Sequence, residues 1–374
     1  MSRATLDARL QEMYCYTICV CTEFALLTAM AYDRYIAICN PLRYLDIMNK
    51  RACAILAAAS WILSNSEMVN YTSVTEFLIL GFPEFPELQL PLFILFSILY
   101  LMAVLGNLLV ICIISADQHL HIPMYFFLAN LSALDICSLS SIVPKMLAIL
   151  LTKDYNISFW GCILQMYCYS ISVCIEFALL TAMAYDRYIA ICNPLRYLII
   201  MNKRACAVLA AASWVVGLLE TLPHHIVISQ FLFCDSNVIN HFFCEVAAVV
   251  KLSCSDTSII QFLNYIQGLF ALLIPFLLTL TSYVFIIFTV LKIRSSEGKS
   301  KAFSTCSSHL TVIILAYGTI IGVYMNPGSM DTAEPNKLPI AMYIVTLPLL
   351  NPLIYSLRSR ELKVALKKAI MKTH

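Results

Sequence analysis

Residues 91–114 read PLFILFSILYLMAVLGNLLVICII and contain no charged side chain. A helix needs about 20 predominantly apolar residues to cross a hydrocarbon core of about 30 Å. We therefore predict that this run is a membrane-spanning helix.

The composition of the whole chain agrees with this prediction. The 374 residues are 61% hydrophobic and 12% charged, whereas soluble domains average about 45–50% apolar and about 25% charged residues. A formal net charge of +2 provides no basic surface for nucleic acid. The composition excludes disorder and a soluble globular protein, and it favours a polytopic membrane protein.

Six further apolar runs follow the first, and each is long enough to cross a bilayer as a helix. A β-barrel would show short alternating segments instead. We therefore predict an all-α membrane protein, a seven-transmembrane helix bundle with a short amphipathic C-terminal helix, within residues 68–374. The predicted spans are 91–114, 122–142, 163–186, 205–222, 257–290, 303–325 and 338–357.

Lys and Arg residues predict the orientation of the bundle, because cytoplasmic loops carry an excess of them. One set of loops and the C-terminal tail together contain fourteen, whereas the opposite side has only Lys145, Lys153, Lys251 and Lys337. The tail is therefore expected in the cytoplasm and the segment before residue 91 outside, in a multi-pass protein of the plasma membrane.

Two N-glycosylation acceptor patterns lie on the side that is expected to be outside. Asn70 begins the triplet Asn-Tyr-Thr before the first span, and Asn156 begins Asn-Ile-Ser on a short loop. Such triplets are common by chance, so their position on this side is what makes them candidates. The loop that holds Asn156 lies close to the bilayer, which favours Asn70 as the modified residue.

An internal repeat precedes the bundle. Residues 13–61 match residues 166–214 at a constant offset of 153, with 44 of 49 positions identical. A functional solenoid would have three or more diverged copies. We interpret residues 1–67 as a recent partial duplicate or a gene-model artefact, with 68–374 as the self-sufficient unit and no signal peptide. The alternative is an extra membrane hairpin.

Polar residues inside the spans are costly in hydrocarbon and therefore informative. Asn107 lies in the first span, Asp135 in the second, and the seventh ends in Asn351-Pro352-Leu353-Ile354-Tyr355. One interpretation is that these residues pair simply to satisfy buried polar groups. The other is a hydrated core that rearranges on activation, with a possible sodium ion near Asp135.

The third span ends in Asp186-Arg187-Tyr188. The adjacent carboxylate can hold the guanidinium by a charge-assisted contact. Release of that contact would free Arg187 to meet a partner's backbone or a tyrosine of another span. The alternative is an arginine that extends to the membrane interface.

Taken together, these residues resemble the rhodopsin-like G-protein-coupled receptors, and longer strings resemble the odorant receptors among them. The resemblance covers residues 68–374, with a departure at Ala316, where the family usually has Phe before Tyr-Gly. The strings begin at Leu120 (LHIPMY), Met183 (MAYDRYIAIC), Lys301 (KAFSTCSSHL) and Pro348 (PLLNPLIYSLR).

The resemblance implies a receptor that binds a small volatile odorant and activates a stimulatory heterotrimeric G protein, which raises cyclic AMP. It implies that the sixth span swings outward while Arg187, Tyr283 and Tyr355 rearrange together. The residues that match the family's activation motifs are Asp186, Arg187, Tyr188, Tyr283, Asn351, Pro352 and Tyr355.

Four cysteines lie on the side expected to be outside, an even number in an oxidising compartment. They are Cys162, Cys234, Cys244 and Cys254, and the sequence alone allows three pairings. The resemblance implies disulfides Cys162–Cys244 and Cys234–Cys254. Most of the other cysteines lie in spans, where they act as small hydrophobic residues.

Ligand-contacting residues are predicted in the outer half of the bundle by matching span positions to the family. Each residue could instead serve ordinary helix packing. The mixture favours a largely hydrophobic ligand with one oxygen function. The candidates are Tyr169, Ser170, Val173, Cys174, Asn264, Gln267, Ile320, Ile321, Tyr324 and Ile344.

No catalytic or metal-binding motif is present in the sequence, so we expect a receptor and not an enzyme. His224-His225, at the end of the fourth span, is expected to be interfacial and not catalytic, and His309 is expected either to contact a partner or to make a cap or dipole contact at a helix end. A transporter would need paired broken helices in related halves. The alternative function that stays open is a non-signalling or decoy membrane protein, mistargeted by the N-terminal duplicate.

Overall fold

The structure is a computed structural model. It describes residues 74–234, 236–324, 337–358 and 362–366, apart from the side chains of 301, 303–305, 322–324 and 356–358. The chain divides into two units, Met1–Thr72 and Ser73–His374, and the described residues belong to the second. The predicted duplicate, residues 1–67, and the candidate Asn70 lie outside the described residues.

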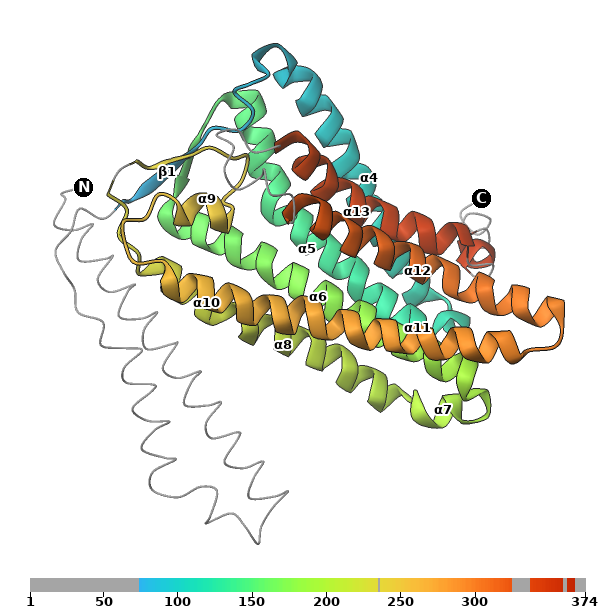
Figure 1. Cartoon of the computed structure of the whole chain (residues 1–374). Helices are drawn as coiled ribbons and strands as arrows, with labels where there is room; N and C mark the ends of the chain where they lie inside the picture. The colour runs from blue at the N-terminus through green and yellow to red at the C-terminus, as the bar shows by residue number, and fades with distance from the viewer. Residues whose placement is uncertain (1–73, 235, 325–336, 359–361, 367–374) are drawn as a thin grey trace, which may run out of the picture. The chain divides into compact units, whose positions relative to one another are not determined.

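Long helices that run side by side form the second unit, with β1 and α9 at one end and α7 at the other (Figure 1). Each of the short 3₁₀ turns η2 (Pro86–Leu88), η3 (Gln118–Leu120) and η4 (Pro194–Arg196) precedes one of the helices. The helices are α4 (Gln89–Ala116), α5 (Pro123–Thr152), α6 (Phe159–Cys192), α7 (Tyr197–Ile200), α8 (Lys203–Ser229), α9 (Val246–Val250), α10 (Ser258–Gln267), α11 (Ile274–Lys292), α12 (Ser296–Tyr324) and α13 (Lys337–Arg358).

Among the described residues, six helical segments are long and apolar enough to cross a membrane, and a shorter apolar stretch, Cys306–Ile321, lies within α12. Together they form the predicted bundle of seven. The helices are longer than the apolar runs: α5 continues to Thr152, and α6 continues to Cys192. Residues 362–366 are also helical, with Leu362 and Ala365 buried and Lys363 exposed.

The fifth span is a composite of α10, the π-helical turn η5 (Gly268–Leu273) and α11. Pro275 follows the turn at the start of α11. Because proline has no amide hydrogen, a regular α-helical ladder cannot run through this position. A π-turn is one of the known ways in which a helix accommodates such an interruption.

A small sheet covers one end of the bundle. Strand β1 (Glu76–Ile79) lies between β2 (Asn156–Ser158), to which it is antiparallel, and β3 (Val238–Ile239), to which it is parallel. Both disulfides lie at this end, which we call the disulfide end. The opposite end, where α6 finishes and α7 begins, is the Arg187 end.

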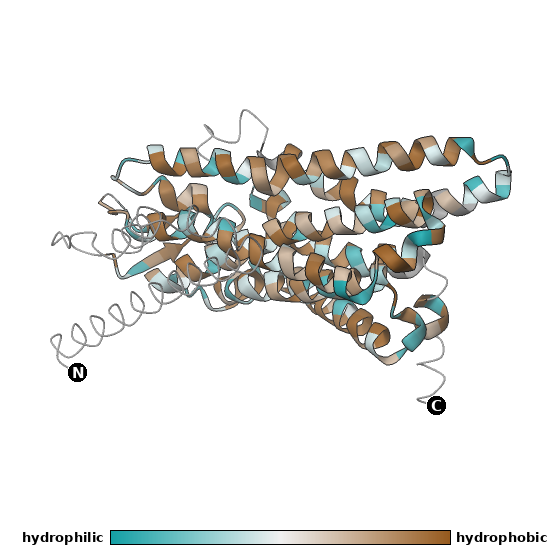
Figure 2. Ribbon diagram, turned by 90° about the horizontal axis from the view of Figure 1, so that it is seen from below, coloured by the Kyte–Doolittle hydropathy of each residue, from teal (hydrophilic) through white to brown (hydrophobic). Residues whose placement is uncertain are grey.

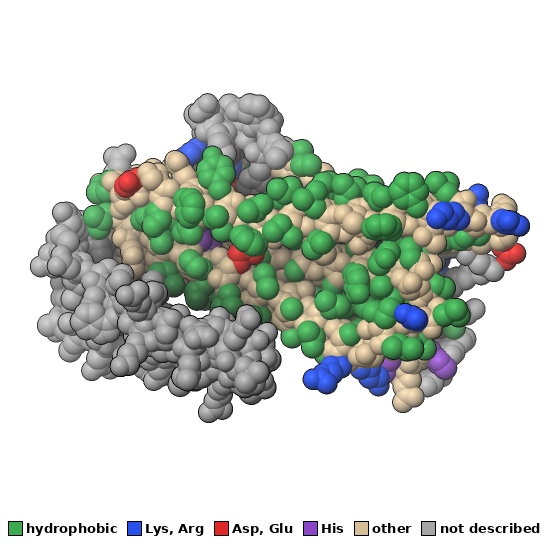
Figure 3. Space-filling model, turned by 60° about the horizontal axis from the view of Figure 1, so that its bottom comes forward, with side chains coloured by type: hydrophobic (Ala, Val, Ile, Leu, Met, Phe, Trp, Pro, Cys, Tyr) green, Lys and Arg blue, Asp and Glu red, His purple; other side chains and the backbone are tan. Residues whose placement is uncertain are grey.

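Apolar side chains both fill the bundle and cover its outside, as expected for helices that face lipid. Figure 2 shows apolar residues along most of each helix. Leu105 and Phe262 are each 61% exposed. In Figure 3 hydrophobic side chains cover the middle of the visible face, and Lys and Arg gather at one end. Exposed basic residues at the Arg187 end include Arg196, Lys203, Arg204, Lys292 and Arg294.

Candidate functional site

Three buried polar side chains link α4, α5 and α13 in the middle of the bundle. The amide Nδ2 of Asn351 donates to Asp135 Oδ2 at 3.0 Å. The amide Nδ2 of Asn107 donates to the carbonyl oxygens of Pro348 at 2.9 Å and Ala103 at 3.0 Å. The three intramembrane polar residues singled out from the sequence therefore belong to one polar core.

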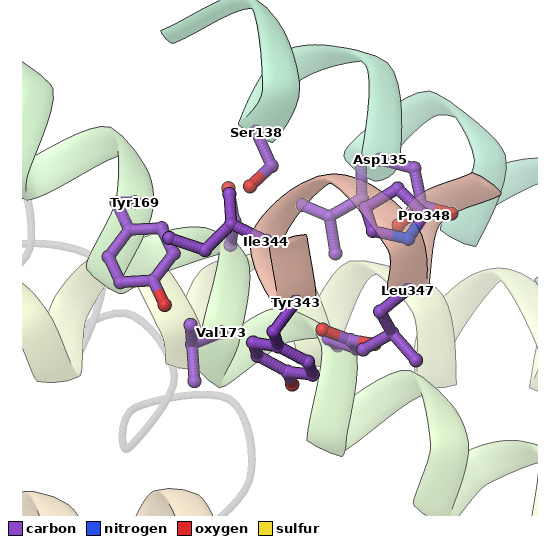
Figure 4. Close-up of a pocket in the computed structure, with 11 residues that line it drawn as sticks. Asp135, Ser138, Tyr169, Val173, Tyr343, Ile344, Leu347 and Pro348 are labelled. Carbon is purple, nitrogen blue, oxygen red and sulfur yellow. The ribbon is translucent and has the colours of Figure 1, made fainter. Parts of the chain in front are cut away.

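A small cavity lies beside this core, between α5, α6 and α13 (Figure 4). Its volume is about 30 Å³, which is room for roughly two water molecules. Asp135 and Ser138 face it from α5, and Tyr343 faces it from α13. The full lining is Leu134, Asp135, Ser138, Tyr169, Ser172, Val173, Glu176, Tyr343, Ile344, Leu347 and Pro348.

Glu176 of α6 brings a second carboxyl group to the cavity wall, which Asp135 lines from α5. Its Oε1 is buried and finds no hydrogen-bond partner among the described residues. Glu176 is not among the residues predicted from the sequence. An acidic residue in the middle of the predicted span 163–186 was the available signal, because such residues are rare in hydrocarbon.

The predicted ligand-contacting residues divide between the cavity and other places. Tyr169, Val173 and Ile344 line the cavity (Figure 4). Ile320 packs against the core, whereas Asn264 is exposed and Ile321 is 53% exposed on the outside of α12. Tyr324 is the last residue of α12, and its side chain lies outside the described part of the chain.

The other three candidates lie where α6 meets α8 and α10. Gln267 Nε2 donates to Cys174 Sγ at 3.5 Å, and Ser170 Oγ lies 3.4 Å from His225 Nε2. His225 also has its Nδ1 2.9 Å from the Thr221 carbonyl oxygen. His224 and His225 lie near the C-terminal end of α8 and are each 3% exposed, so the pair packs inside the bundle.

At the Arg187 end, the adjacent residues Asp186 and Arg187 form an ion pair near the C-terminal end of α6. Arg187 Nε and Nη2 donate to Asp186 Oδ2 at 3.0 Å and 2.5 Å. The other carboxylate oxygen of Asp186 accepts from the Tyr197 hydroxyl at 2.8 Å. Burial raises the pKa of Tyr197, and the Asp186 charge raises it further, so this hydroxyl stays protonated and able to donate.

Tyrosines of two other helices lie near this ion pair. Arg187 interacts electrostatically with Tyr283 of α11 and Tyr355 of α13. The Tyr355 hydroxyl is buried and has no hydrogen-bond partner among the described residues, while the Tyr283 hydroxyl lies 2.8 Å from His309 Nδ1. His309 is fully buried and lies in the middle of α12, so it does not cap a helix end.

At the disulfide end, the loop between α8 and α10 is fastened over the bundle. The disulfides join Cys162 to Cys244 and Cys234 to Cys254, the pairing that the resemblance implies. Gln165 of α6 accepts from the Cys244 amide at 2.9 Å. The candidate glycosylation residue Asn156 is exposed in β2 at the same end.

The loop between α8 and α10 also carries a buried histidine, His241. Burial lowers the pKa of His241 to about 3, and the nearby Lys337 ammonium contributes in the same direction. Burial raises the pKa of Glu245, whose Oε2 lies 3.5 Å from His241 Nε2. The contact therefore joins a neutral imidazole to a carboxyl group and is not an ion pair at neutral pH.

Comparison with known proteins matches most of the chain to one family of membrane receptors. The family model described as "Olfactory receptor" matches residues 96–373, and the model "7 transmembrane receptor (rhodopsin family)" matches residues 10–73. Olfactory receptor 1S1 of Homo sapiens is 48% identical over 306 residues, which are 82% of this chain and 94% of that protein.

Two more relatives have similar coverage. Olfactory receptor 1F1 of Homo sapiens is 48% identical over 301 residues, 80% of this chain and 96% of its own. Olfactory receptor 1M1 of Mus musculus is 45% identical over 304 residues, 81% of this chain and 97% of its own.

The seven-helix bundle, its polar core and the ion pair at the end of α6 define a G-protein-coupled receptor of the rhodopsin class, a multi-pass membrane protein without enzymatic activity. Within this class, the chain belongs to the olfactory receptor family.

Proposed function

We propose that this receptor binds a small volatile odorant in the half of the bundle nearest the disulfide end and activates a stimulatory heterotrimeric G protein, which raises cyclic AMP. The disulfide end is then extracellular and the Arg187 end cytoplasmic. The exposed lysines and arginines at the Arg187 end support this orientation, because short cytoplasmic loops are enriched in them. Disulfides form in oxidising compartments, which supports an extracellular position for the disulfide end.

The cavity between α5, α6 and α13 must open to admit an odorant. Drug-sized ligands occupy pockets of about 300–1,000 Å³, whereas this cavity measures about 30 Å³. The Tyr169 ring lies between the cavity and Phe243, with ring centroids 5.3 Å apart. We expect these rings to move when a largely hydrophobic ligand with one oxygen function binds. The ligand then favours the active state by its difference in affinity for the two states.

The observation that carries the proposal is the Arg187–Asp186 ion pair beside the buried Tyr283 and Tyr355. Arg187 has only Asp186 as a hydrogen-bonding partner among the described residues, and the contact is local to α6. Movement of α12 would change the surroundings of Tyr283 through its contact with His309. Arg187 could then exchange Asp186 for a tyrosine hydroxyl or a carbonyl group of the G protein.

The residues around the cavity also suit a sodium ion. Sodium prefers hard oxygen ligands, as other hard cations do, and Asp135, Glu176 and Ser138 present such oxygens. The unpartnered buried Oε1 of Glu176 supports this fit. A bound sodium ion would offset one negative charge of the two neighbouring carboxyl groups, and we propose that Asp135 and Glu176 hold it.

The proposed signalling is tested by replacing Arg187 in cells that carry a cyclic AMP reporter. We expect Arg187→Ala to reduce odorant-driven cyclic AMP about tenfold or more, a change equivalent to ~1.4 kcal/mol. Arg196→Ala is the matched control, because Arg196 is an exposed arginine at the same end. It should retain the signal.

Surface labelling has to show equal delivery of the variants. An intact response of Arg187→Ala would contradict the mechanism. Surface delivery of the unchanged chain without a response to any odorant of a broad panel would favour the alternative, a non-signalling or decoy membrane protein.

A further inference from the structure

A buried lysine joins three separate segments at the disulfide end. Lys337, the first residue of α13, is 3% exposed. Its Nζ donates to Gly81 O at 3.2 Å, to Glu84 Oε1 at 2.5 Å and to Asn240 Oδ1 at 2.6 Å. An ammonium group has three donors, so every donor of Lys337 has an acceptor. The acceptors come from the segment before α4 and from the loop between α8 and α10.

The burial of Lys337 distinguishes it from an ordinary loop lysine, which extends its charge into water. Glu84 supplies the opposite charge and is itself only 25% exposed. Because the ammonium of Lys337 is buried, removal of Glu84 would leave its charge uncompensated, and this favours a fixed geometry for the partly buried ion pair. The contact therefore holds the three segments in one arrangement.

The segment that Lys337 holds through Asn240 covers the bundle. We call residues 238–244 the lid. The Leu80 amide donates to the Ile239 carbonyl at 3.0 Å, and the Gly81 amide donates to the His241 carbonyl at 2.9 Å. The lid ends at Cys244, which is bonded to α6. These contacts attach the lid to the segment before α4 and to α6, and Lys337 attaches it to α13.

Both routes from Lys337 lead to the cavity. Along the lid, Phe243 lies three residues after Asn240, and its ring packs on Tyr169, which lines the cavity. Along α13, Tyr343 and Ile344 line the cavity, about two helical turns or 10 Å from Lys337. Lys337 thus provides a polar connection between the lid and the α13 wall of the cavity, beside the apolar core that Phe243 shares with Ile344.

We propose that Lys337 is a positioning residue for odorant binding. It holds the lid against the start of α13, a contact that we call the lock, and so fixes the position of the lid relative to the α13 wall of the cavity. The ammonium group contacts no ligand in this scheme and acts through Asn240 and Glu84. This inference rests on the proposed ligand site at the cavity.

The lock is tested first without any ligand, by hydrogen exchange on the purified full-length receptor. The Gly81 amide, which donates to His241, reports on the middle of the lid, and the Cys244 amide reports on its end. Lys337→Gln should exchange at both amides about tenfold faster or more, because the lid opens more often. Lys337→Arg, which keeps the charge, should stay closer to the unchanged chain.

Lys145→Gln is the matched control. Lys145 also forms an ion pair at the disulfide end, but its partner Asp154 lies only nine residues further along the chain. This variant should leave exchange at Gly81 and Cys244 unchanged. Equal exchange in Lys337→Gln and Lys145→Gln would overturn the lock.

The second arm measures the half-maximal concentration of an odorant. A panel of medium-chain aliphatic alcohols and aldehydes is screened first, and an odorant that activates the unchanged receptor is used. Lys337→Gln should raise the half-maximal concentration about tenfold, with equal surface delivery, and Lys337→Arg should restore most of the potency. Faster exchange with unaltered potency would overturn the positioning role.

The two arms separate this inference from the proposed function. If the unchanged receptor responds to no odorant, the proposed function fails while the exchange result still decides the lock. If Lys337→Gln is not delivered to the surface, Glu84→Gln takes its place in both arms, because it removes only the counter-charge. It should change exchange and potency in the same direction.

Discussion

At the scale of single residues, His241 makes the stability of the receptor depend on pH. Its pKa is lowered to about 3, whereas an unfolded histidine has a pKa of about 6.5. Below pH 6.5 the unfolded chain therefore binds a proton that the folded chain does not bind. His241 thus costs no stability above pH 6.5 and costs about 1.4 kcal/mol per pH unit as the pH falls toward 3.

Melting temperatures of the purified receptor at pH 7.5 and pH 5 test this dependence. His241→Gln should lose less stability than the unchanged chain on acidification, by ~2 kcal/mol at pH 5. Both proteins contain Glu245, whose raised pKa changes stability with pH in the opposite sense, so much of its contribution cancels when they are compared. Both also keep the charge of Lys337. His119→Gln, which changes an exposed histidine, should leave the dependence as it is. Parallel profiles for His241→Gln and the unchanged chain would contradict the assignment.

At the scale of elements, the contact of α6 with α8 requires a glycine. A Cβ added at Gly217 would lie 2.5 Å from Ile175 Cγ1 and 3.3 Å from the Ile175 amide nitrogen. Gly217→Ala should therefore push the two helices apart and destabilise the receptor by about 1–3 kcal/mol. Gly268→Ala is the control, since no atom lies within 4 Å of its added Cβ. A melting temperature that is lower for Gly268→Ala than for Gly217→Ala would contradict this interpretation.

The sequence predicts which elements exist better than where they end. The span predicted at 122–142 is part of α5, which runs through Pro144 and Lys145 to Thr152. An apolar run indicates the part of a helix that faces hydrocarbon, whereas the helix itself continues into the polar region until a cap or turn ends it. At Lys153 the backbone turns to a φ of 56°, and no hydropathy pattern encodes that position.

The polar core could be predicted from the sequence for a physical reason, and Lys337 could not. Asp135 and Asn351 lie in apolar spans, so each needs a polar partner within the bundle, and they contact each other. In the sequence, nothing around Lys337 distinguishes it from the other lysines that precede or follow a span. Its burial depends on Glu84 and Asn240, which are distant along the chain. Local patterns carry no information on such contacts.

At the scale of the whole molecule, residues 68–374 should function without the preceding segment. The unit Ser73–His374 contains the polar core, the cavity, both disulfides and the Arg187 ion pair. The olfactory relatives match 301–306 residues of this chain and are covered over 94–97% of their own length. The chain 68–374 should therefore reach the cell surface and give the same half-maximal odorant concentration as 1–374, within about twofold.

The direction of any difference follows from how apolar segments insert into a membrane. Residues 13–61 repeat most of the third span and the start of the fourth. Their second apolar run, 52–63, is shorter than the ~20 residues that a spanning helix requires. A partial repeat of this kind would present surplus apolar residues to the insertion machinery, so surface labelling of 68–374 should equal or exceed that of 1–374. Weaker labelling or a lost cyclic AMP response in 68–374 would show that the first 67 residues belong to the working receptor.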